Sequence, residues 1–197
     1  MSVVYSKSDF FYGVNSIDLK TMWMIYCNIK RQLPSLAILI SFIFYSIDPA
    51  FATDKNDMVG TQAPHVSLFK LKNNKYYRTK KLIGKKDIVL SFFATWCSPC
   101  LKEIPELHKL SEEMSDIEFI LVNVNEKRDK VAKHVNKKGY TLPVILDKYG
   151  VALKSFKAES LPLPLTVVID KKGIITYYQS GYEPGDEKIL KNHLEKI

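Results

Sequence analysis

The sequence predicts an α/β fold: a central mixed β-sheet flanked by helices, with a β-hairpin added at the N-terminal side. Short, nearly continuous apolar runs, typical of buried strands, alternate with segments whose apolar residues recur at helical spacing. Strands that alternate with helices pair in parallel through right-handed crossovers. Two strands near the C-terminus are separated only by a short turn, so antiparallel pairing is expected there and the sheet is mixed.

The first half of the predicted domain contains a hairpin and two buried strands. Residues 65–69 alternate weakly, and the polar segment 73–80 suits a turn and a returning strand. Residues 87–94 and 117–124 are apolar runs that predict central strands. Between them, apolar residues at helical spacing predict a helix from Ser98, with the inner positions Leu101, Ile104, Leu107 and Leu110.

The second half continues the alternation. Residues 126–138 predict a charged helix that ends at Gly139. Residues 143–147 are too short for a firm assignment, and residues 148–156 are expected to be helical. Residues 165–170 form another predicted strand, followed by a turn and the antiparallel strand 174–179. A helix over residues 184–197 closes the chain.

The first 52 residues have the composition of an export signal rather than of a domain. Lys30 and Arg31 precede an uncharged run over residues 33–47, and Ala50-Phe51-Ala52 matches a cleavage site. The run is too short for an ordinary membrane span. We therefore expect translation to start near Met24, a signal peptide over residues 24–52, and a domain over residues 53–197. The alternative is an uncleaved N-terminal membrane anchor. Both interpretations imply a periplasmic or otherwise extracytoplasmic domain.

The charge is positive, at +8 for the whole chain. Residues 53–197 keep 25 Lys and Arg against 18 Asp and Glu, a net charge of +7. Such a charge favours acidic partners or anionic membrane surfaces. The lysines are scattered, without a basic stripe interleaved with aromatic residues, so we interpret them as a solvated surface and expect no nucleic-acid partner.

Two of the three cysteines lie together in the stretch W96-C-S-P-C100, and the third, Cys27, belongs to the expected signal. A predicted strand ends near Ala94 and a helix begins at Cys97 or Ser98. Cys97 then meets the unpaired N–H groups and positive dipole end of that helix, which favour its reactive thiolate form. Pro99 fits the first helical turn. Cys100, three residues on, can close a disulfide with Cys97.

Two other uses of this pair are possible from the spacing alone. A zinc site needs further ligands, and the predicted domain offers only histidines without metal spacing: His65, His108, His134 and His193. A purely structural disulfide closing so small a loop gains little stability. A C-x-x-C at a strand-to-helix junction therefore favours redox exchange, for which no bound cofactor and no metal is expected.

The stretch F92-F-A-T-W-C-S-P-C-L-K-E-I-P105 resembles the active-site motif of thioredoxin-fold proteins. The pattern W-C-x-P-C-x-x-E-x-P is more narrowly similar to the TlpA/ResA-like thiol–disulfide oxidoreductases of the cell envelope, over residues 58–197. The resemblance implies a thioredoxin fold. It also implies a departure from cytoplasmic thioredoxins, which have a buried aspartate where this chain has Ser91, so Ser91 cannot accept the proton of Cys100.

The resemblance assigns roles to several residues near the cysteine pair. Glu103 matches a glutamate that tunes the thiols, and a partly buried carboxylate there can accept or donate a proton; the alternative is an ordinary surface glutamate. Pro164 matches the cis-proline that faces the cysteines, with Pro162 as a rival candidate. The candidate substrate-binding residues are Trp96, Pro99, Leu163 and Pro164, with the backbone of Leu163 pairing with an extended substrate; a plain packing role for Trp96 is the alternative.

Most members of the resembled family are reductases. The resemblance thus implies a disulfide reductase for protein substrates, re-reduced by a membrane electron donor, with apocytochrome c or copper-delivery proteins as typical clients. The cytochrome-dedicated subgroup often has G-V-x-G-x-P-E before the cis-proline, whereas this chain has F156-K-A-E-S-L-P-L-P164. We expect a monomer.

Three other functions compete with this one. A DsbA-type oxidase needs a helical insertion for which the connections here are too short. A thiol peroxidase needs P-x-x-x-[ST]-x-x-C, and the corresponding positions are Leu90 and Ala94. A non-catalytic binding or chaperone module with an inert disulfide remains as the alternative outside the enzymes.

Overall fold

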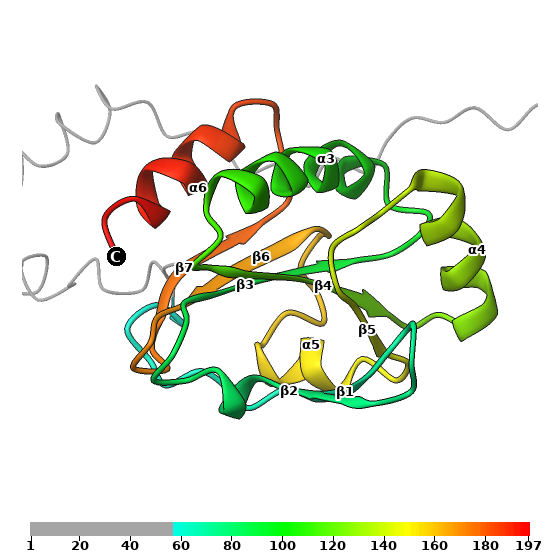
Figure 1. Cartoon of the computed structure of the whole chain (residues 1–197), viewed down its shortest axis with the longest axis horizontal. Helices are drawn as coiled ribbons and strands as arrows, with labels where there is room; N and C mark the ends of the chain where they lie inside the picture. The colour runs from blue at the N-terminus through cyan, green and yellow to red at the C-terminus, as the bar shows by residue number, and fades with distance from the viewer. Residues whose placement is uncertain (1–56) are drawn as a thin grey trace, which may run out of the picture. The chain divides into compact units, whose positions relative to one another are not determined.

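The computed structural model describes residues 57–197, which contain one seven-stranded sheet and its covering helices (Figure 1). The strand order is β2-β1-β5-β4-β3-β6-β7. The strands are β1 (Ser67–Lys70), β2 (Tyr76–Arg78), β3 (Ile88–Phe93), β4 (Glu118–Val124), β5 (Val144–Asp147), β6 (Leu165–Ile169) and β7 (Ile175–Ser180). The predicted signal peptide, its cleavage after Ala52 and Cys27 lie outside the described residues.

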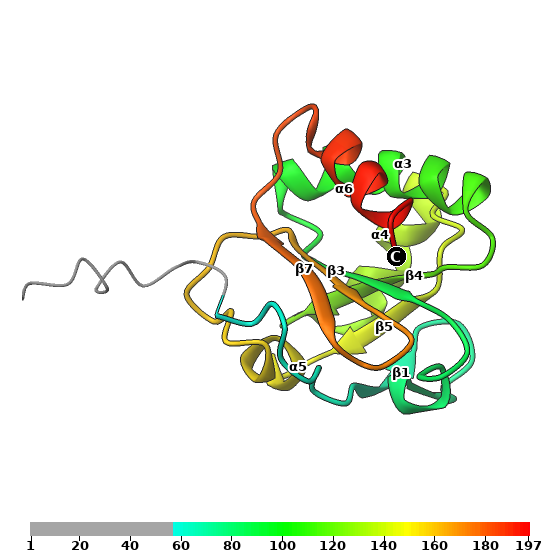
Figure 2. The same ribbon diagram turned by 90° about the vertical axis from the view of Figure 1, so that its left-hand side faces the viewer.

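The sheet is mixed, as predicted. Strands β3, β4 and β5 are parallel, while β6, β7, β1 and β2 pair antiparallel with their neighbours. Figures 1 and 2 show α3, α4 and α6 on one face of the sheet and α5 on the other. The helices are α3 (Ser98–Glu113), α4 (Arg128–Lys138), α5 (Val151–Ser155) and α6 (Asp186–Leu194), with a 3-10 turn η1 (Thr79–Lys81) after β2.

The core lies between these layers and is centred on β3, which leads to the cysteines, and on β6, which begins directly after Pro164. Every residue of β3 and of β6 is buried, because helices cover both faces of these central strands. Phe92 of β3 and Phe156 at the end of α5 pack edge to face, with ring centroids 5.4 Å apart. The apolar runs that the sequence predicts as strands therefore form the buried core beneath the cysteine pair.

The structure confirms the predicted order of elements and refines three of them. The short segment of unassigned type is the strand β5, and the helix after it is limited to α5. Helix α4 begins at Arg128 rather than at residue 126, so Glu126 lies in the preceding loop. Gly139 ends α4 with a φ of 68°, a left-handed conformation that glycine adopts without strain.

The two outer strands β1 and β2 are the predicted N-terminal hairpin. They pair with each other from Ser67 opposite Arg78 to Phe69 opposite Tyr76, and β1 joins the sheet through β5. Among the helices of residues 57–197, none combines the length and the apolar character needed to cross a membrane.

Candidate active site

Cys97 and Cys100 form a disulfide at the N-terminus of α3. Cys97 is the N-cap residue: its φ and ψ of −79° and 105° are extended, and its sulfur accepts a hydrogen bond from the backbone N–H of Cys100 at 3.2 Å. Pro99 lies in the first turn, where its missing N–H removes no helical hydrogen bond. When the pair is reduced, the helix dipole and these N–H groups stabilise a thiolate on Cys97.

A groove of about 420 Å³ opens beside Cys97. Its walls come from the active-site turn and from the loop before β6, and most are apolar. The exposed fraction of Trp96 is 70%, so the ring stands at the mouth of the groove rather than in the core. The lining residues are Trp96, Cys97, Ser98, Pro99, Val124, Asn125, Leu153, Glu159, Leu161, Pro162 and Leu163.

The loop before β6 contributes Leu163 to this groove, and the peptide bond between Leu163 and Pro164 is cis. Pro164, not Pro162, is therefore the cis-proline. Pro164 itself is buried, and its carbonyl accepts a hydrogen bond from the N–H of Gly181 at 2.7 Å. The structure thus brings Trp96, Pro99 and Leu163 together around Cys97, with Pro164 behind them.

Glu103 does not line this groove and is buried, with an exposed fraction of 5%. Its carboxylate accepts hydrogen bonds from the hydroxyls of Ser91, at 2.7 Å, and of Thr166, at 2.5 Å. Ser91 and Thr166 face each other across the β3–β6 pair. Burial raises the pKa of Glu103, and the two hydroxyls offset this only in part. The side chain is thus more deeply buried than the sequence predicted, and it is not a surface glutamate.

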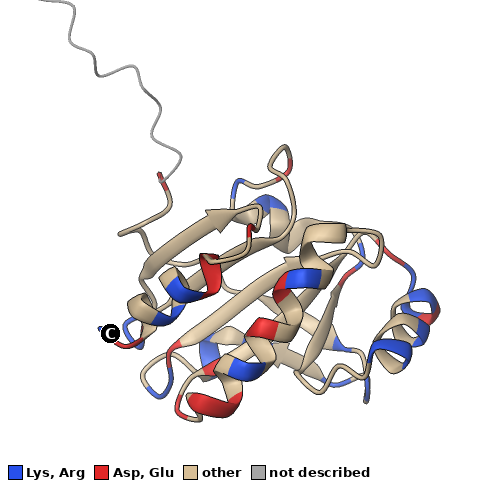
Figure 3. Cartoon of the chain, turned by 90° about the horizontal axis from the view of Figure 1, so that it is seen from above, with Lys and Arg blue, Asp and Glu red and all other residues tan. Residues whose placement is uncertain are grey.

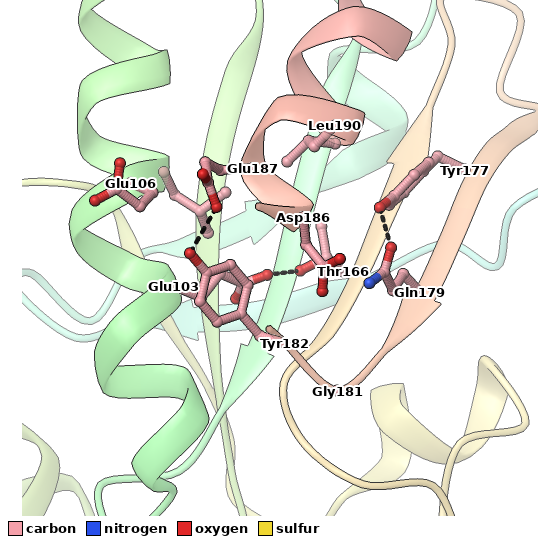
Figure 4. A pocket seen from close by; sticks show the side chains of 11 residues that line it. Glu103, Glu106, Thr166, Tyr177, Gln179, Gly181, Tyr182, Asp186, Glu187 and Leu190 are labelled. Atoms are coloured by element: carbon pink, nitrogen blue, oxygen red, sulfur yellow. Dashed lines mark hydrogen bonds between the residues drawn. The ribbon is translucent and has the colours of Figure 1, made fainter. Parts of the chain in front are cut away.

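A small cavity of about 10 Å³ lies next to Glu103, beneath α6 (Figure 4). Such a volume is at the lower limit for one water molecule. Figure 4 shows that Tyr182 and Asp186 border it, and that the hydroxyl of Tyr182 donates to Glu187 at 2.8 Å. Cys97 lines the groove but not this cavity, whereas Glu103 lines the cavity but not the groove. The carboxyl group of Glu103 and Cys97 therefore line different pockets.

Glu126 was missed by the sequence analysis, which placed it at the start of a charged helix. In the structure its carboxylate accepts hydrogen bonds from the N–H and the hydroxyl of Thr95, at 2.7 and 2.6 Å, and from Asn123 at 2.8 Å. The Nζ atom of Lys130 lies 2.7 Å from Oε1 of Glu126. Burial alone would raise the pKa of Glu126, but the hydrogen bonds from Lys130, Thr95 and Asn123 outweigh it and lower the pKa to about 2. A permanent anion thus holds the turn that leads to Trp96 and Cys97.

The signal that could have revealed this contact is topological. Thr95 follows β3 and Glu126 follows β4, and these neighbouring strands are parallel. The carboxyl ends of neighbouring parallel strands meet at the same edge of the sheet. A carboxylate directly after β4 therefore lies within reach of the turn after β3.

Comparison with known proteins agrees with this geometry. The family model described as Redoxin matches residues 58–194. The thiol-disulfide oxidoreductase ResA of Geobacillus kaustophilus (strain HTA426) is 32% identical over 165 residues, which is 82% of this chain and 91% of that protein. Its counterpart from Geobacillus thermodenitrificans (strain NG80-2) is 31% identical over the same shares.

Solved structures share the fold. The crystal structure of a putative thiol:disulfide interchange protein DsbE from Chlorobium tepidum superposes with a TM-score of 0.65 at 20% identity, covering 70% of this chain and 96% of that one. A thiol:disulfide interchange protein of the thioredoxin family from Chlorobium tepidum TLS gives a TM-score of 0.58 at 26% identity, covering 70% and 99%.

The fold and the cysteine pair define a thioredoxin-fold protein with a redox-type disulfide at the start of its active-site helix. The chain belongs to the Redoxin family, in its ResA-like branch, and it is a thiol–disulfide oxidoreductase.

Proposed function

We propose that the domain is an extracytoplasmic reductase of disulfides in protein substrates. The observation that carries this proposal is the Cys97–Cys100 disulfide at the N-terminus of α3, open to a groove whose opposite wall is Leu163. The groove is lined mainly by apolar residues, which suits an extended polypeptide, and Trp96 and Pro99 lie in it beside the nucleophile Cys97. Protein substrates follow from the family.

The reaction transfers two electrons from the reduced pair to the substrate. The thiolate of Cys97 attacks one sulfur of the substrate disulfide, forms a mixed disulfide and releases the other sulfur as a thiolate. Cys100 then loses its proton and attacks the sulfur of Cys97. This step closes the Cys97–Cys100 disulfide and releases the second substrate sulfur. The substrate ends as a dithiol, and the enzyme must be reduced again by a donor, for which we propose a membrane electron-transfer protein.

Glu103 is proposed to take the proton of Cys100. The two residues are three positions apart on α3 and thus on one face of the helix. Burial raises the pKa of this carboxyl group, so it holds a proton more readily than a free carboxyl group does, whereas Ser91 cannot accept one. Leu163 is proposed to align the substrate through its backbone, next to the cis peptide bond.

The test measures the reduction potential of residues 53–197 by equilibration against glutathione, with thiol trapping and mass spectrometry. A value well below about −200 mV is expected for a reductase, whereas about −120 mV, the value of the oxidant DsbA, would reverse the proposed direction. Cys97→Ser should abolish the reduction of insulin disulfides. Full activity of a Cys97→Ser, Cys100→Ser double variant would instead support the binding or chaperone module. Apocytochrome c and copper-delivery proteins are the first clients to assay.

A further inference from the structure

The positive charge of the domain is concentrated in one segment. Residues 57–197 contain 24 Lys and Arg against 17 Asp and Glu. Residues 58–86 contain eight of these cations and no Asp or Glu, which leaves 16 cations against 17 anions elsewhere in the domain. We call residues 67–86, which carry all eight, the basic hairpin. Its cations are Lys70, Lys72, Lys75, Arg78, Lys80, Lys81, Lys85 and Lys86.

These cations are hardly compensated. Among the described residues, only Lys86 of the eight has a carboxylate within 4.0 Å, that of Glu118 at the limit of this distance. The helices on the opposite side differ. Figure 3 shows acidic and basic positions mixed along α3 and α6, and Lys109 and Lys191 there are paired with Glu106 and Glu113. The basic hairpin is thus a surface of one sign.

Exposed aromatic rings accompany this charge. Phe69 and Tyr76 face each other across β1 and β2, with ring centroids 4.1 Å apart, and their exposed fractions are 43% and 53%. The guanidinium of Arg78 lies 5.5 Å from the ring of Tyr76. Tyr149, which is 76% exposed, lines with them a shallow hollow of about 620 Å³. Uncovered aromatic rings inside a cationic surface indicate a contact with something both anionic and partly apolar.

We propose that the basic hairpin docks the domain on an anionic lipid bilayer. Seven of its eight cations are lysines, which act as point charges without the bidentate geometry that arginine offers to an individual carboxylate or phosphate. A diffuse anionic surface matches such a patch, and lysines near it are attracted without specific contacts. Tyrosine rings settle at the level of lipid head groups, which gives Tyr76 and Tyr149 a place in the same contact.

When the domain is docked through the basic hairpin, the position of the hairpin in the sheet leaves the disulfide accessible. Strands β5 and β4 separate β1 from β3, the strand that leads to Cys97. At about 5 Å per strand, roughly 15 Å of sheet lies between the docking edge and the strand of the active site. The hairpin is also the first element of the domain after the apolar run of residues 33–47. A domain docked in this way could exchange electrons with a membrane donor while its groove remains open.

The test measures binding of residues 53–197 to sedimented vesicles. The described domain has its own core, so it can be studied without the preceding segment. We expect binding to vesicles of equal parts phosphatidylglycerol and phosphatidylcholine, little binding to pure phosphatidylcholine, and a loss of binding as salt rises. A Lys72→Gln, Lys75→Gln, Lys80→Gln variant should bind about a hundredfold more weakly, since each lysine near an anionic surface contributes about fivefold.

The matched control removes the same charge from α4. Lys133→Gln, Lys137→Gln, Lys138→Gln should bind nearly as the wild type does. An equal loss in both triple variants would overturn the docking surface, because binding would then follow net charge alone. Absence of binding to the anionic vesicles would overturn the proposal outright. Tighter binding to poly-glutamate or to duplex RNA than to vesicles would overturn the lipid proposal and indicate an acidic protein or a nucleic acid as the partner.

This inference can fail independently of the proposed function. Vesicle binding needs no cysteine, so the Cys97→Ser, Cys100→Ser double variant should bind as the wild type does. The hairpin variant should keep its reduction potential and its activity on soluble insulin. A hairpin variant that lost both vesicle binding and insulin reduction, with an unchanged thermal unfolding midpoint, would show that the basic hairpin binds protein substrate instead.

Discussion

Two buried glutamates flank the disulfide, and their surroundings give them opposite proton affinities. Glu103 and Glu126 have exposed fractions of only 5% and 7%. Burial raises the pKa of Glu103, whose partners are two hydroxyl groups. Burial acts in the same direction on Glu126, yet a lysine, a backbone N–H, a hydroxyl and an amide together lower its pKa to about 2. The comparison shows that partner chemistry, not burial, decides which carboxyl can carry protons and which remains an anion.

The largest effect is expected from Glu126→Gln. The amide cannot accept from all four donors, and it leaves Lys130 and the turn at Thr95 without their anion. We expect a loss of about 2 kcal/mol in the free energy of unfolding at pH 7, the usual size for hydrogen bonds to a charged group. Urea unfolding measures it. Glu113→Gln is the control, because its exposed pair with Lys191 should contribute little to stability.

The pH dependence of the free energy of unfolding should distinguish Glu126 from Glu103. The folded pKa of Glu126, about 2, lies below its ordinary value of 4.5. Its contribution is therefore complete above about pH 5 and is lost as the pH falls toward 2. Wild type and Glu126→Gln should converge in stability over that window. A constant difference from pH 7 to pH 2 would show that the carboxylate is not the source of the effect.

Glu103→Gln should act in the opposite direction and less strongly. The folded pKa of Glu103 is raised, so its favourable neutral form is complete below about pH 4.5 and is lost as the pH rises through the folded pKa. The variant should match the wild type in acid and gain about 1 kcal/mol at pH 7, where a buried carboxylate is incompletely compensated. Urea unfolding at both pH values checks this. A loss of stability at pH 7 would mean that Ser91 and Thr166 compensate the charge fully.

Glu103→Gln also tests whether Glu103 influences the protonation of the cysteine thiols. Removing a negative charge near Cys100 favours its thiolate, so alkylation of the reduced pair should proceed at lower pH in Glu103→Gln. Trapping with iodoacetamide and mass spectrometry across a pH series measures the profile. Glu126→Gln should leave the alkylation profile of Cys100 unchanged, because Glu126 accepts its hydrogen bonds from Thr95 rather than from the cysteine pair. Equal shifts in both variants would remove the distinction between the two carboxylates.

The sequence predicted one of these glutamates and not the other, for physical reasons. Glu103 shares a helix with Cys100, so spacing along one element, together with the motif, placed it near the thiols. Glu126 meets Thr95 across 31 positions, through the parallel register of β3 and β4, which no local pattern reveals. Buried strands and helices were predicted well because their signal is periodic and local. The prediction that Ser91 cannot accept a proton rests on its residue type alone, whereas its hydrogen bond to Glu103 depends on the packing of α3 against the sheet.

Topology also adds to what the sequence predicted about the charge. Along the sequence the lysines of residues 70–86 resemble the scattered lysines of a solvated surface. In the structure they flank the outermost strand of the sheet, and Phe69 and Tyr76 stand exposed among them. The composition predicted that the domain is positively charged. The structure adds that these cations lie at the edge of the sheet, beside exposed aromatic rings.

The smallest effect is expected from Ser91→Ala. This substitution tests how a hydroxyl group changes the pKa of Glu103. Losing one neutral donor at 2.7 Å should raise the pKa of Glu103 further and cost about 0.5 kcal/mol at pH 7. Because Ser91 acts through the ionised carboxylate, the same change in a Glu103→Gln background should cost less. A double-mutant cycle by urea unfolding at pH 7 measures this coupling, which should approach about 0.5 kcal/mol, the lower end of the range for residues in direct contact. A coupling of zero would mean that Ser91 only fills space in β3, and that Thr166 alone holds the carboxyl group.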